Sequence, residues 1–226
     1  MAGALLMGRS HGLQRIQLLL KSLGRIETMM IDVWPDGSLR GFCDHRETET
    51  EDLKTPGQIR VMRSNEGEQP YTGVLPLIEG GIAKQLESYL SQSEQIQASV
   101  TMWIDPLTGQ GGAFMVEPLP QCPPKRLARL IHAVEGFEVV LPEERTHAFI
   151  ASWINGGAGA IETASSELRY ECRCSKESLI DIMRKFSSSD RDHLFSNQPS
   201  TEVHCDYCAN VYQISVEDLL SSETSS

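Results

Sequence analysis

Over the first 120 residues, apolar and polar positions alternate in short runs, which is the pattern of β-strands with one buried face. The turn WPDG at 34–37 joins two of these runs, because proline presets the φ of a turn and glycine accepts a positive φ. A helical stripe with apolar positions 82, 86, 89 and 90 interrupts the series. We therefore expect an α+β domain with a mostly antiparallel sheet and packed helices over residues 1–120. The expected strands are residues 16–20, 25–33, 38–42, 58–63, 71–75, 99–104 and 113–117.

The pattern changes after the proline-rich stretch PLPQCPP at 118–124. Apolar positions now recur at helical spacing, first at 127, 130, 131 and 134, and then at 149, 150 and 153. Small residues fill most of the stretch that follows, GGAGAIETASS at 156–166. We interpret residues 121–168 as a helical linker. Its apolar positions are too few for independent folding, so we expect it to pack on another part of the chain.

The last segment, residues 169–226, combines an amphipathic helix with a hairpin. Ser175 is the expected N-cap of a helix over 176–186. A shorter helix is expected near 191–195, and VHCDYCANVYQI at 203–214 has the pattern of a tight hairpin. The apolar core of this segment is thin. The expected apolar face of its first helix consists of Leu179, Ile182, Met183 and Phe186.

Composition argues against several classes of function. The chain has 31 acidic and 20 basic side chains, and its net charge of −11 disfavours nucleic-acid binding, which depends on clustered Lys and Arg. No apolar run reaches the roughly 18–20 residues that span a bilayer, so we expect no membrane association. The opening MAGALLMGRS has no basic residues before its apolar stretch, and we interpret it as part of a helix rather than as a secretory signal. The expected location is the cytoplasm, or an organelle if the source is eukaryotic.

Catalytic motifs are also missing from the sequence. It has no Ser/His/Asp order, no phosphate-cradling glycine loop and no HExxH, and its six histidines are scattered. Gly111-Gly112 belongs to a turn rather than to a nucleotide-binding loop. We therefore expect that the protein is not an enzyme.

Four of the six cysteines form two close pairs, Cys172-Arg-Cys174 and Cys205-Asp-Tyr-Cys208. Four thiolates that arrive as two short-range pairs suit a tetrahedral zinc site. Residues i and i+2 of an extended segment share a face, so the one-residue spacing of the first pair still permits chelation. In a reducing compartment such cysteines remain thiols or bind metal. The sequence therefore predicts one four-cysteine zinc site.

Other interpretations of the cysteines remain open. A thioredoxin-like redox motif requires a βαβ context before a helix, whereas the second pair runs into a predicted strand. A purely structural zinc site without switching is the main alternative. His204 adjoins the second pair, but four sulfurs already complete a zinc shell, so we expect it near the ligands or at the surface. Cys43 and Cys122 have no partner at short spacing and are expected to be ordinary loop or edge thiols.

The spacing of the pairs also suggests a redox switch. Thiolates that bind zinc are the form of cysteine that oxidants attack. The members of each pair are close enough to form a disulfide, and a Cys172–Cys174 bridge closes a small, strained ring that is readily reduced again. Because the last segment has little core, we hypothesise that oxidation, by removing the metal, unfolds it.

Motifs along the whole chain carry a family resemblance. The cysteine pattern is followed by Asn210 and Tyr212, and the first domain contains DGSLRG at 36–41, YTGVLPL at 71–77, SEQI at 93–96 and GGAFMVEP at 111–118. Together these motifs resemble the 33 kDa redox-regulated heat-shock chaperonin family, from Ala2 to about Ile214. The chain differs from the usual pattern in beginning inside the family's opening segment and in having a shorter acidic loop at 44–56.

This resemblance implies an ATP-independent holdase. The reduced protein is then inactive and holds Zn²⁺ through Cys172, Cys174, Cys205 and Cys208. Oxidation releases the zinc and forms disulfides within each pair, the tail and linker unfold, and exposed apolar surface binds unfolding client proteins. The oxidised protein is expected to be a homodimer. The implied parts are a client-binding and dimerisation domain at 1–120, a linker at 121–168 and a redox-sensing zinc-binding domain at 169–226.

Overall fold

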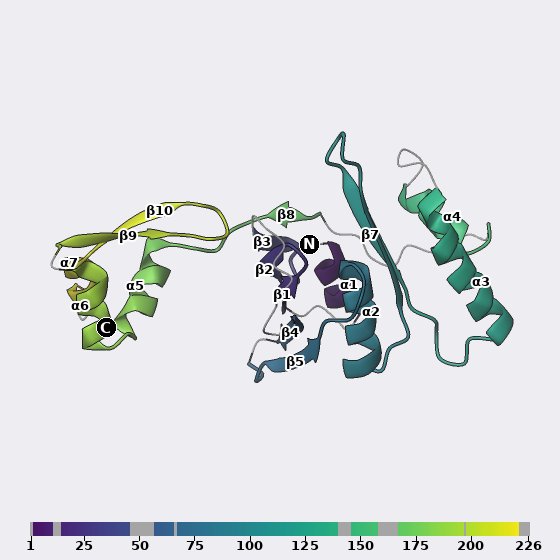
Figure 1. Ribbon diagram of the computed structural model, residues 1–226, viewed down its shortest axis with the longest axis horizontal. Helices are drawn as coiled ribbons and strands as arrows, with labels where there is room; N and C mark the ends of the chain where they lie inside the picture. Colours follow the sequence, from purple (N-terminus) through teal and green to yellow (C-terminus); the bar gives the residue numbers. More distant parts are fainter. Residues whose placement is uncertain are drawn as a thin grey trace. The chain divides into compact units, whose positions relative to one another are not determined.

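The computed structural model describes residues 2–10, 15–45, 57–65, 67–139, 146–157, 167–196 and 198–221 (Figure 1). The chain divides into two compact units, Met1–Arg169 and Tyr170–Ser226. Most of the expected loop at 44–56 and most of the small-residue stretch at 156–166 lie outside the described residues. The predicted α+β class is confirmed: a large antiparallel sheet is combined with helices, and a cysteine cluster lies near the C-terminus.

A six-stranded sheet forms the centre of the first unit, in the order β5-β4-β1-β2-β3-β8. Neighbouring strands from β5 to β3 are antiparallel. The predicted WPDG turn joins β2 to β3: the amide of Trp34 donates to the carbonyl of Ser38 at 2.9 Å, and Gly37 has a φ of +83°. The strands are β1 (Arg15–Leu23), β2 (Ile26–Val33), β3 (Ser38–His45), β4 (Gln58–Ser64), β5 (Tyr71–Pro76) and the short edge strand β8 (Arg169–Tyr170).

One face of this sheet is buried under two helices. Ile16, Leu18 and Leu20 alternate along β1 and are almost completely inaccessible to solvent. The helices α1 (Ala2–Ser10) and α2 (Ile82–Ser93) supply the apolar groups that pack on them (Figure 1). The predicted stripe of α2 is the part that enters the core, through Leu86, Tyr89 and Leu90.

The other face of the sheet contains a buried carboxylate that the sequence pattern does not reveal. Asp32 is fully buried and accepts hydrogen bonds from Arg15 and Arg40, each at 3.0 Å, and from Gln17 at 3.1 Å. Both guanidinium groups lie over the indole of Trp34, each 5.3 Å from its centroid. A buried charge is stable only with such partners, so this cluster ties three neighbouring strands to one arrangement.

The predicted linker helices form and pack against a hairpin of the first unit. The hairpin consists of β6 (Ser99–Ile104) and β7 (Gly111–Val116), and the helices are α3 (Pro124–Glu135) and α4 (His147–Ile154), with a 3₁₀ turn at Gly136–Val139 after α3. Phe137 is fully buried among aromatic side chains of the hairpin. Partly buried residues complete this small core, namely Trp103, Val116, Val134, Phe149, Ile150 and Ile154.

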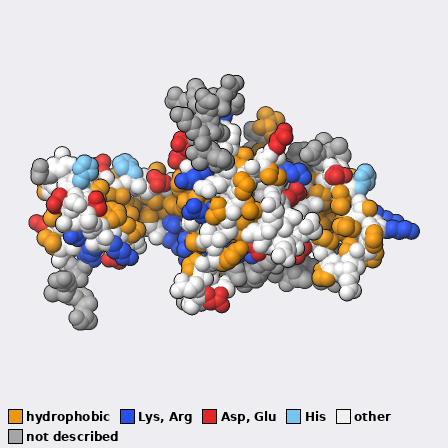
Figure 2. Space-filling view, turned by 60° about the horizontal axis from the view of Figure 1, so that its bottom comes forward, with side chains coloured by type: hydrophobic (Ala, Val, Ile, Leu, Met, Phe, Trp, Pro, Cys, Tyr) orange, Lys and Arg blue, Asp and Glu red, His pale blue; other side chains and the backbone are white. Residues whose placement is uncertain are grey.

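Several apolar side chains of the first unit face solvent (Figure 2). Ile104 and Leu107, at the end of the β6–β7 hairpin, are 71% and 94% exposed, and Leu119 is 80% exposed. Exposed apolar groups of this size are typical of interaction surfaces when they gather in one region. No helix in the described ranges is long and apolar enough to cross a bilayer.

The second unit has a small core between helices and a hairpin. Its elements are α5 (Lys176–Arg184), α6 (Ser188–Phe195), β9 (Ser200–His204), β10 (Val211–Ser215) and α7 (Val216–Leu220). The prediction of the buried face of α5 was partly wrong. Ile180 and Met183 are buried, whereas Ile182 is 50% exposed, and Phe186 is 42% exposed because it lies beyond the end of the helix. The core consists of Ile180, Met183, Phe195 and Ile214, with Leu179, Val203, Tyr212 and Leu219 packed around it.

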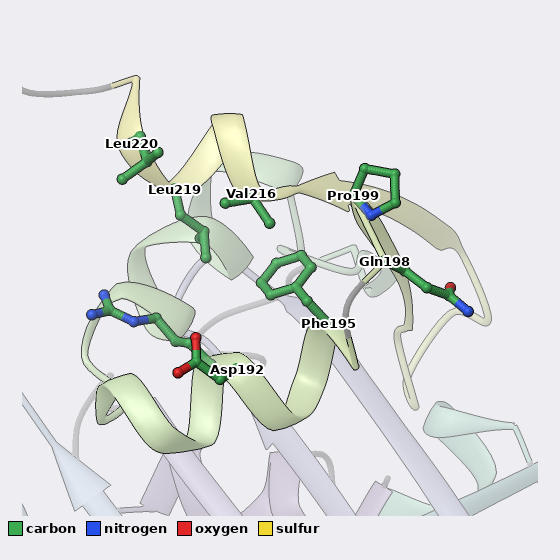
Figure 3. Close-up of a pocket in the computed structure, with 8 residues that line it drawn as sticks. Asp192, Phe195, Gln198, Pro199, Val216, Leu219 and Leu220 are labelled. Atoms are coloured by element: carbon green, nitrogen blue, oxygen red, sulfur yellow. The ribbon is translucent and has the colours of Figure 1, made fainter.

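An open groove of the second unit lies beside α7 (Figure 3). Its walls are largely apolar, and a charged pair, Arg191 and Asp192, lies at its edge. None of the four paired cysteines lines it. The remaining lining residues are Phe195, Gln198, Pro199, Val216, Leu219 and Leu220.

The predicted N-cap of α5 is confirmed, and its removal should weaken the second unit. The Ser175 hydroxyl accepts a hydrogen bond from the Ser178 amide at 3.1 Å. We expect Ser175→Ala to lower the free energy of unfolding of this unit by about 1 kcal/mol, as measured by denaturant titration. Ser175→Asp keeps a capping oxygen and should retain most of the stability. Equal losses in both variants would contradict a capping role.

Candidate metal centre

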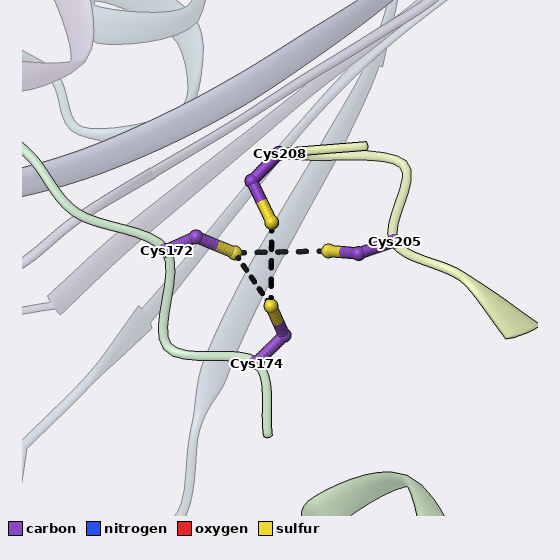
Figure 4. Close-up of side chains that lie close together, drawn as sticks. All are labelled: Cys172, Cys174, Cys205 and Cys208. Atoms are coloured by element: carbon purple, nitrogen blue, oxygen red, sulfur yellow. Dashed lines mark hydrogen bonds between the residues drawn. The ribbon is translucent and has the colours of Figure 1, made fainter. Parts of the chain in front are cut away.

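Four cysteine sulfur atoms from two chain segments meet in the second unit (Figure 4). Cys172 and Cys174 lie in the extended segment before α5, and Cys205 and Cys208 lie in the turn between β9 and β10. The Sγ–Sγ distances are 3.3 Å for 172/174, 3.7 Å for 172/205 and 3.4 Å for 174/208. All four sulfur atoms lie within 4.8 Å of one another. The structure therefore brings together the four cysteines that the sequence singles out.

Backbone hydrogen bonds shape the turn that carries the second pair. The amide of Cys205 donates to the carbonyl of Asn210 at 2.9 Å, and the amide of Ala209 donates to the carbonyl of Cys205 at 2.8 Å. Ala209 takes a left-handed φ of +57°, which reverses the chain directly after Cys208. From there β10 pairs with β9, starting with Val211 opposite His204. Strand pairing and this compact turn thus hold the two sulfurs of the second pair together.

The donor set fits a zinc ion. A tetrahedral zinc–thiolate site, with Zn–S distances of about 2.3 Å, places its sulfurs about 3.8 Å apart. The three Sγ–Sγ distances of 3.3–3.7 Å require only a small expansion to reach this value. Four sulfurs without oxygen donors suit a soft or borderline metal rather than Ca²⁺ or Mg²⁺, which bind oxygen.

Comparison with known proteins assigns the chain to a family. A family model described as Hsp33 protein matches residues 1–215. The chain belongs to the Hsp33 family. The resemblance inferred from the sequence motifs is thereby confirmed.

Curated relatives of this Hsp33-family chain carry the name 33 kDa chaperonin. The protein from Synechococcus elongatus is 27% identical over 241 residues, which cover 97% of this chain and 81% of the relative. The protein from Thermus thermophilus is 26% identical over 250 residues, which cover 98% of this chain and 73% of the relative. A crystal structure of the 33 kDa chaperonin from Thermotoga maritima has the same fold, with a TM-score of 0.74, 21% identity, and coverage of 97% of this chain and 82% of that one.

Three of the sulfurs in this Hsp33-family chain, those of Cys172, Cys174 and Cys208, differ in their affinity for protons. Burial acts to raise the pKa of Cys172, but hydrogen bonds from the Cys174 amide and from the neighbouring cysteines outweigh it and lower the pKa to about 7. The Tyr212 hydroxyl acts to lower the pKa of Cys174, but burial and the three other sulfurs raise it to about 12. The Asn210 amide and Cys174 act to lower the pKa of Cys208, yet burial, Cys172 and Cys205 leave it raised. Protons are therefore shared within the cluster.

Metal binding should consequently depend steeply on pH. Zinc needs thiolates, so protons compete with it, and the raised pKa values of Cys174 and Cys208 keep both groups protonated in the metal-free protein at pH 6–8. Stabilisation by the metal is then present at high pH and is lost as the pH falls. We expect the apparent zinc affinity to fall at least about 100-fold for each unit by which the pH is lowered, because at least the two protons of Cys174 and Cys208 must leave. Chelator competition at pH 6, 7 and 8 measures this slope, and a slope below tenfold would contradict it.

Two tyrosine hydroxyls contact the cysteine segments. The hydroxyl of Tyr212, on β10, lies 3.1 Å from the Cys174 Sγ atom. The hydroxyl of Tyr170, which precedes the first pair, donates to the carbonyl of Tyr207 inside the turn of the second pair. Sequence reasoning missed both contacts, because it treated Tyr212 only as part of the cysteine motif and did not consider Tyr170. Each tyrosine links one cysteine segment to the other.

The remaining candidate residues lie outside the sulfur cluster. The His204 side chain is 64% exposed, and its Nε2 atom lies 3.8 Å from a Glu202 carboxylate oxygen, so it is at the surface. Cys43 is exposed on β3, and Cys122 is partly exposed in the turn before α3. Neither thiol joins the paired cysteines.

Proposed function

We propose that this protein is a redox-regulated, ATP-independent holdase. The observation that carries the proposal is the meeting of two cysteine pairs in one four-sulfur cluster, on a unit with a small core. The name of the curated relatives, 33 kDa chaperonin, supports a chaperone in the general sense. In this proposal the protein binds unfolding clients and catalyses no reaction.

In the reduced protein, Cys172, Cys174, Cys205 and Cys208 would hold one Zn²⁺ as thiolates. When bound, the metal would offset half of the negative charge of the four thiolates and join the two segments that carry them. The chain supplies both halves of the site independently of each other, one before α5 and one between β9 and β10. Loss of either pair therefore separates the two segments. We propose residues 169–226 as the sensing domain.

Oxidation would act on the sulfurs of each pair. A thiolate attacks peroxide, takes one oxygen to become a sulfenic acid, and the released hydroxide is protonated to water. The second thiolate of the pair attacks the sulfenic sulfur, an S–S bond forms, and hydroxide again leaves as water. Two thiolates lose two electrons to one peroxide, and two protons are consumed. The 3.3 Å separation of the Cys172 and Cys174 sulfurs suits such a step.

A disulfide removes two thiolate ligands, and the second unit then depends on its core alone. Among the described residues, that core contains four buried apolar side chains, which is little for a unit of this size. We propose that it unfolds together with the linker at 121–168, and that the apolar surface so released binds clients. Residues 1–120 would provide client binding and dimerisation. This scheme needs a reducing compartment at rest, such as the cytoplasm.

Zinc content and holdase activity, measured together before and after peroxide, test the proposal. The reduced protein should retain zinc and leave the aggregation of a heat-denatured test client unchanged. The peroxide-treated protein should lose zinc, form disulfides and suppress aggregation, and reductant with zinc should reverse these changes. The double variant Cys43→Ser/Cys122→Ser is the matched control and should behave like wild type. Zinc retention in peroxide without holdase activity would favour the alternative, a constitutive structural-zinc interaction module.

A further inference from the structure

Tyr212 connects the core of the second unit to the sulfur cluster. It lies on β10 opposite Val203, and its ring packs against the buried residues of this unit. Its hydroxyl lies 3.1 Å from the Cys174 Sγ atom and 3.4 Å from the carbonyl oxygen of the same residue. The hydroxyl has one proton for these two acceptors. When Cys174 is a thiolate, the charged sulfur is the stronger acceptor and also the nearer one.

A hydrogen bond to a thiolate changes its chemistry. Oxidation of Cys174 begins when a sulfur lone pair attacks the peroxide oxygen. An O–H donor stabilises that lone pair in the resting site, and this stabilisation is lost as the sulfur forms its bond to oxygen. Groups that hydrogen-bond to metal ligands tune the site in a comparable way. The hydrogen bond therefore raises the barrier to oxidation without taking part in the metal shell.

Tyr170 offers an internal comparison for this effect. Its hydroxyl also bridges the two cysteine segments, but it donates to the carbonyl oxygen of Tyr207. Each tyrosine can lose its hydroxyl through replacement by phenylalanine while the ring is kept. Both changes remove one cross-link between the segments. Of these two changes, the one at Tyr212 removes a hydrogen bond to the Cys174 Sγ atom.

We propose that Tyr212 sets the oxidation threshold of the cysteine cluster by donating a hydrogen bond to the Cys174 thiolate. The inference rests on the proposed function, since it concerns how readily the same site is oxidised. It adds a residue outside the four cysteines to the sensing machinery. The fixed position of the ring in the core keeps the donor in place while the unit is folded.

Stopped-flow measurement of zinc release under excess peroxide tests the inference on the zinc-loaded full chain. Tyr212→Phe should release zinc about three- to tenfold faster than wild type, because a hydrogen bond to a charged group is lost. Tyr170→Phe should stay within about twofold of wild type, since its hydrogen bond goes to a neutral carbonyl. The Co²⁺-substituted protein provides a readout without oxidant. Its sulfur-to-cobalt charge-transfer band should move to lower energy in Tyr212→Phe and remain in place in Tyr170→Phe.

The outcomes separate this inference from the proposed function. If wild type releases zinc in peroxide but Tyr212→Phe does so at the same rate, the proposed function stands and the inference is wrong. Equal acceleration in both phenylalanine variants would show that only a structural cross-link matters and would also overturn it. A wild-type protein that binds no zinc, or keeps its zinc in peroxide, overturns both the proposed function and this inference.

A second substitution covers the case in which Tyr212→Phe fails to fold. 3-Fluorotyrosine at position 212 keeps the shape of the side chain, and its hydroxyl is a stronger hydrogen-bond donor, so it should slow zinc release. An unchanged rate would overturn the inference.

Discussion

Removal of zinc from the reduced protein is expected to unfold the second unit and to leave the sheet of the first unit folded. In the part of the second unit (Tyr170–Ser226) that the structure describes, the core consists of four buried apolar side chains. Structural zinc contributes about 10–16 kcal/mol of apparent binding free energy in small zinc peptides. The whole stability of a typical domain is about 5–15 kcal/mol. The binding free energy of one zinc ion is thus large enough to decide whether this unit folds.

Hydrogen exchange of the zinc-loaded and chelator-treated protein measures this effect segment by segment. Protection of α5, α6, β9 and β10 should be lost, while protection of β1, β2 and β4 is retained. Cys208→Ser should reproduce the result without a chelator, because it removes one of the four proposed zinc ligands. Cys43→Ser is the matched control, since Cys43 is exposed on a strand away from the cluster. A second unit that keeps its protection after zinc removal would contradict the prediction and the switching mechanism with it.

The strands of the first unit could be predicted because their local pattern and their final burial coincide. Ile16, Leu18 and Leu20 alternate in the sequence, and the same three side chains are buried beneath the helices. The burial of Asp32 could not be predicted, because local sequence patterns assign a carboxylate within a strand to the solvent-exposed face. Its burial depends on Arg15 and Arg40, which strand register brings to it from neighbouring strands.

The second unit shows the limit of helical periodicity. The sequence pattern favoured Ile182 for the buried face of α5, but the helix buries Ile180 instead. The buried face of α5 is set by its packing against α7, a helix that was not predicted. This five-residue helix, Val216–Leu220, is too short to have a periodic signature. A capping box stabilises the start of this helix locally. A tertiary contact stabilises its end, because the Arg184 side chain donates hydrogen bonds to the carbonyls of Asp218 and Leu219.

The meeting of the four cysteines could be predicted from the sequence, but the groups around them could not. Two short cysteine spacings are a local signal, and they correctly indicated which sulfurs meet. The Tyr212 hydroxyl reaches Cys174 across 38 positions of the chain, so no spacing rule could indicate it. Groups that modulate a metal site generally come from wherever the fold places them. Sequence reasoning is therefore stronger for the ligands of such a site than for its reactivity.

Truncation of Phe137 is expected to free α3 and α4 from the β6–β7 hairpin. The Phe137 ring is fully buried, 4.8 Å from the Phe114 ring in an edge-on arrangement and 5.6 Å from the Trp103 ring. Replacing such a phenylalanine by alanine costs about 3–5 kcal/mol. The other residues of α3 and α4 in this core are only partly buried. The lost packing free energy should therefore exceed what the remaining contacts of the two helices can offset.

Hydrogen exchange and tryptophan fluorescence of Phe137→Ala measure the release. Amides of 124–139 and 146–154 should exchange faster, and the tryptophan emission should shift to longer wavelength as Trp103 becomes exposed. Under the proposed function, this variant should suppress client aggregation to some extent before any peroxide is added, while it still holds zinc. Leu119→Ala is the matched control, because that side chain is 80% exposed and its truncation leaves no cavity. Unchanged protection of 124–139 and 146–154 would mean that the helices do not depend on Phe137. Full release of the helices without any holdase activity would mean that freeing the linker is not what enables client binding.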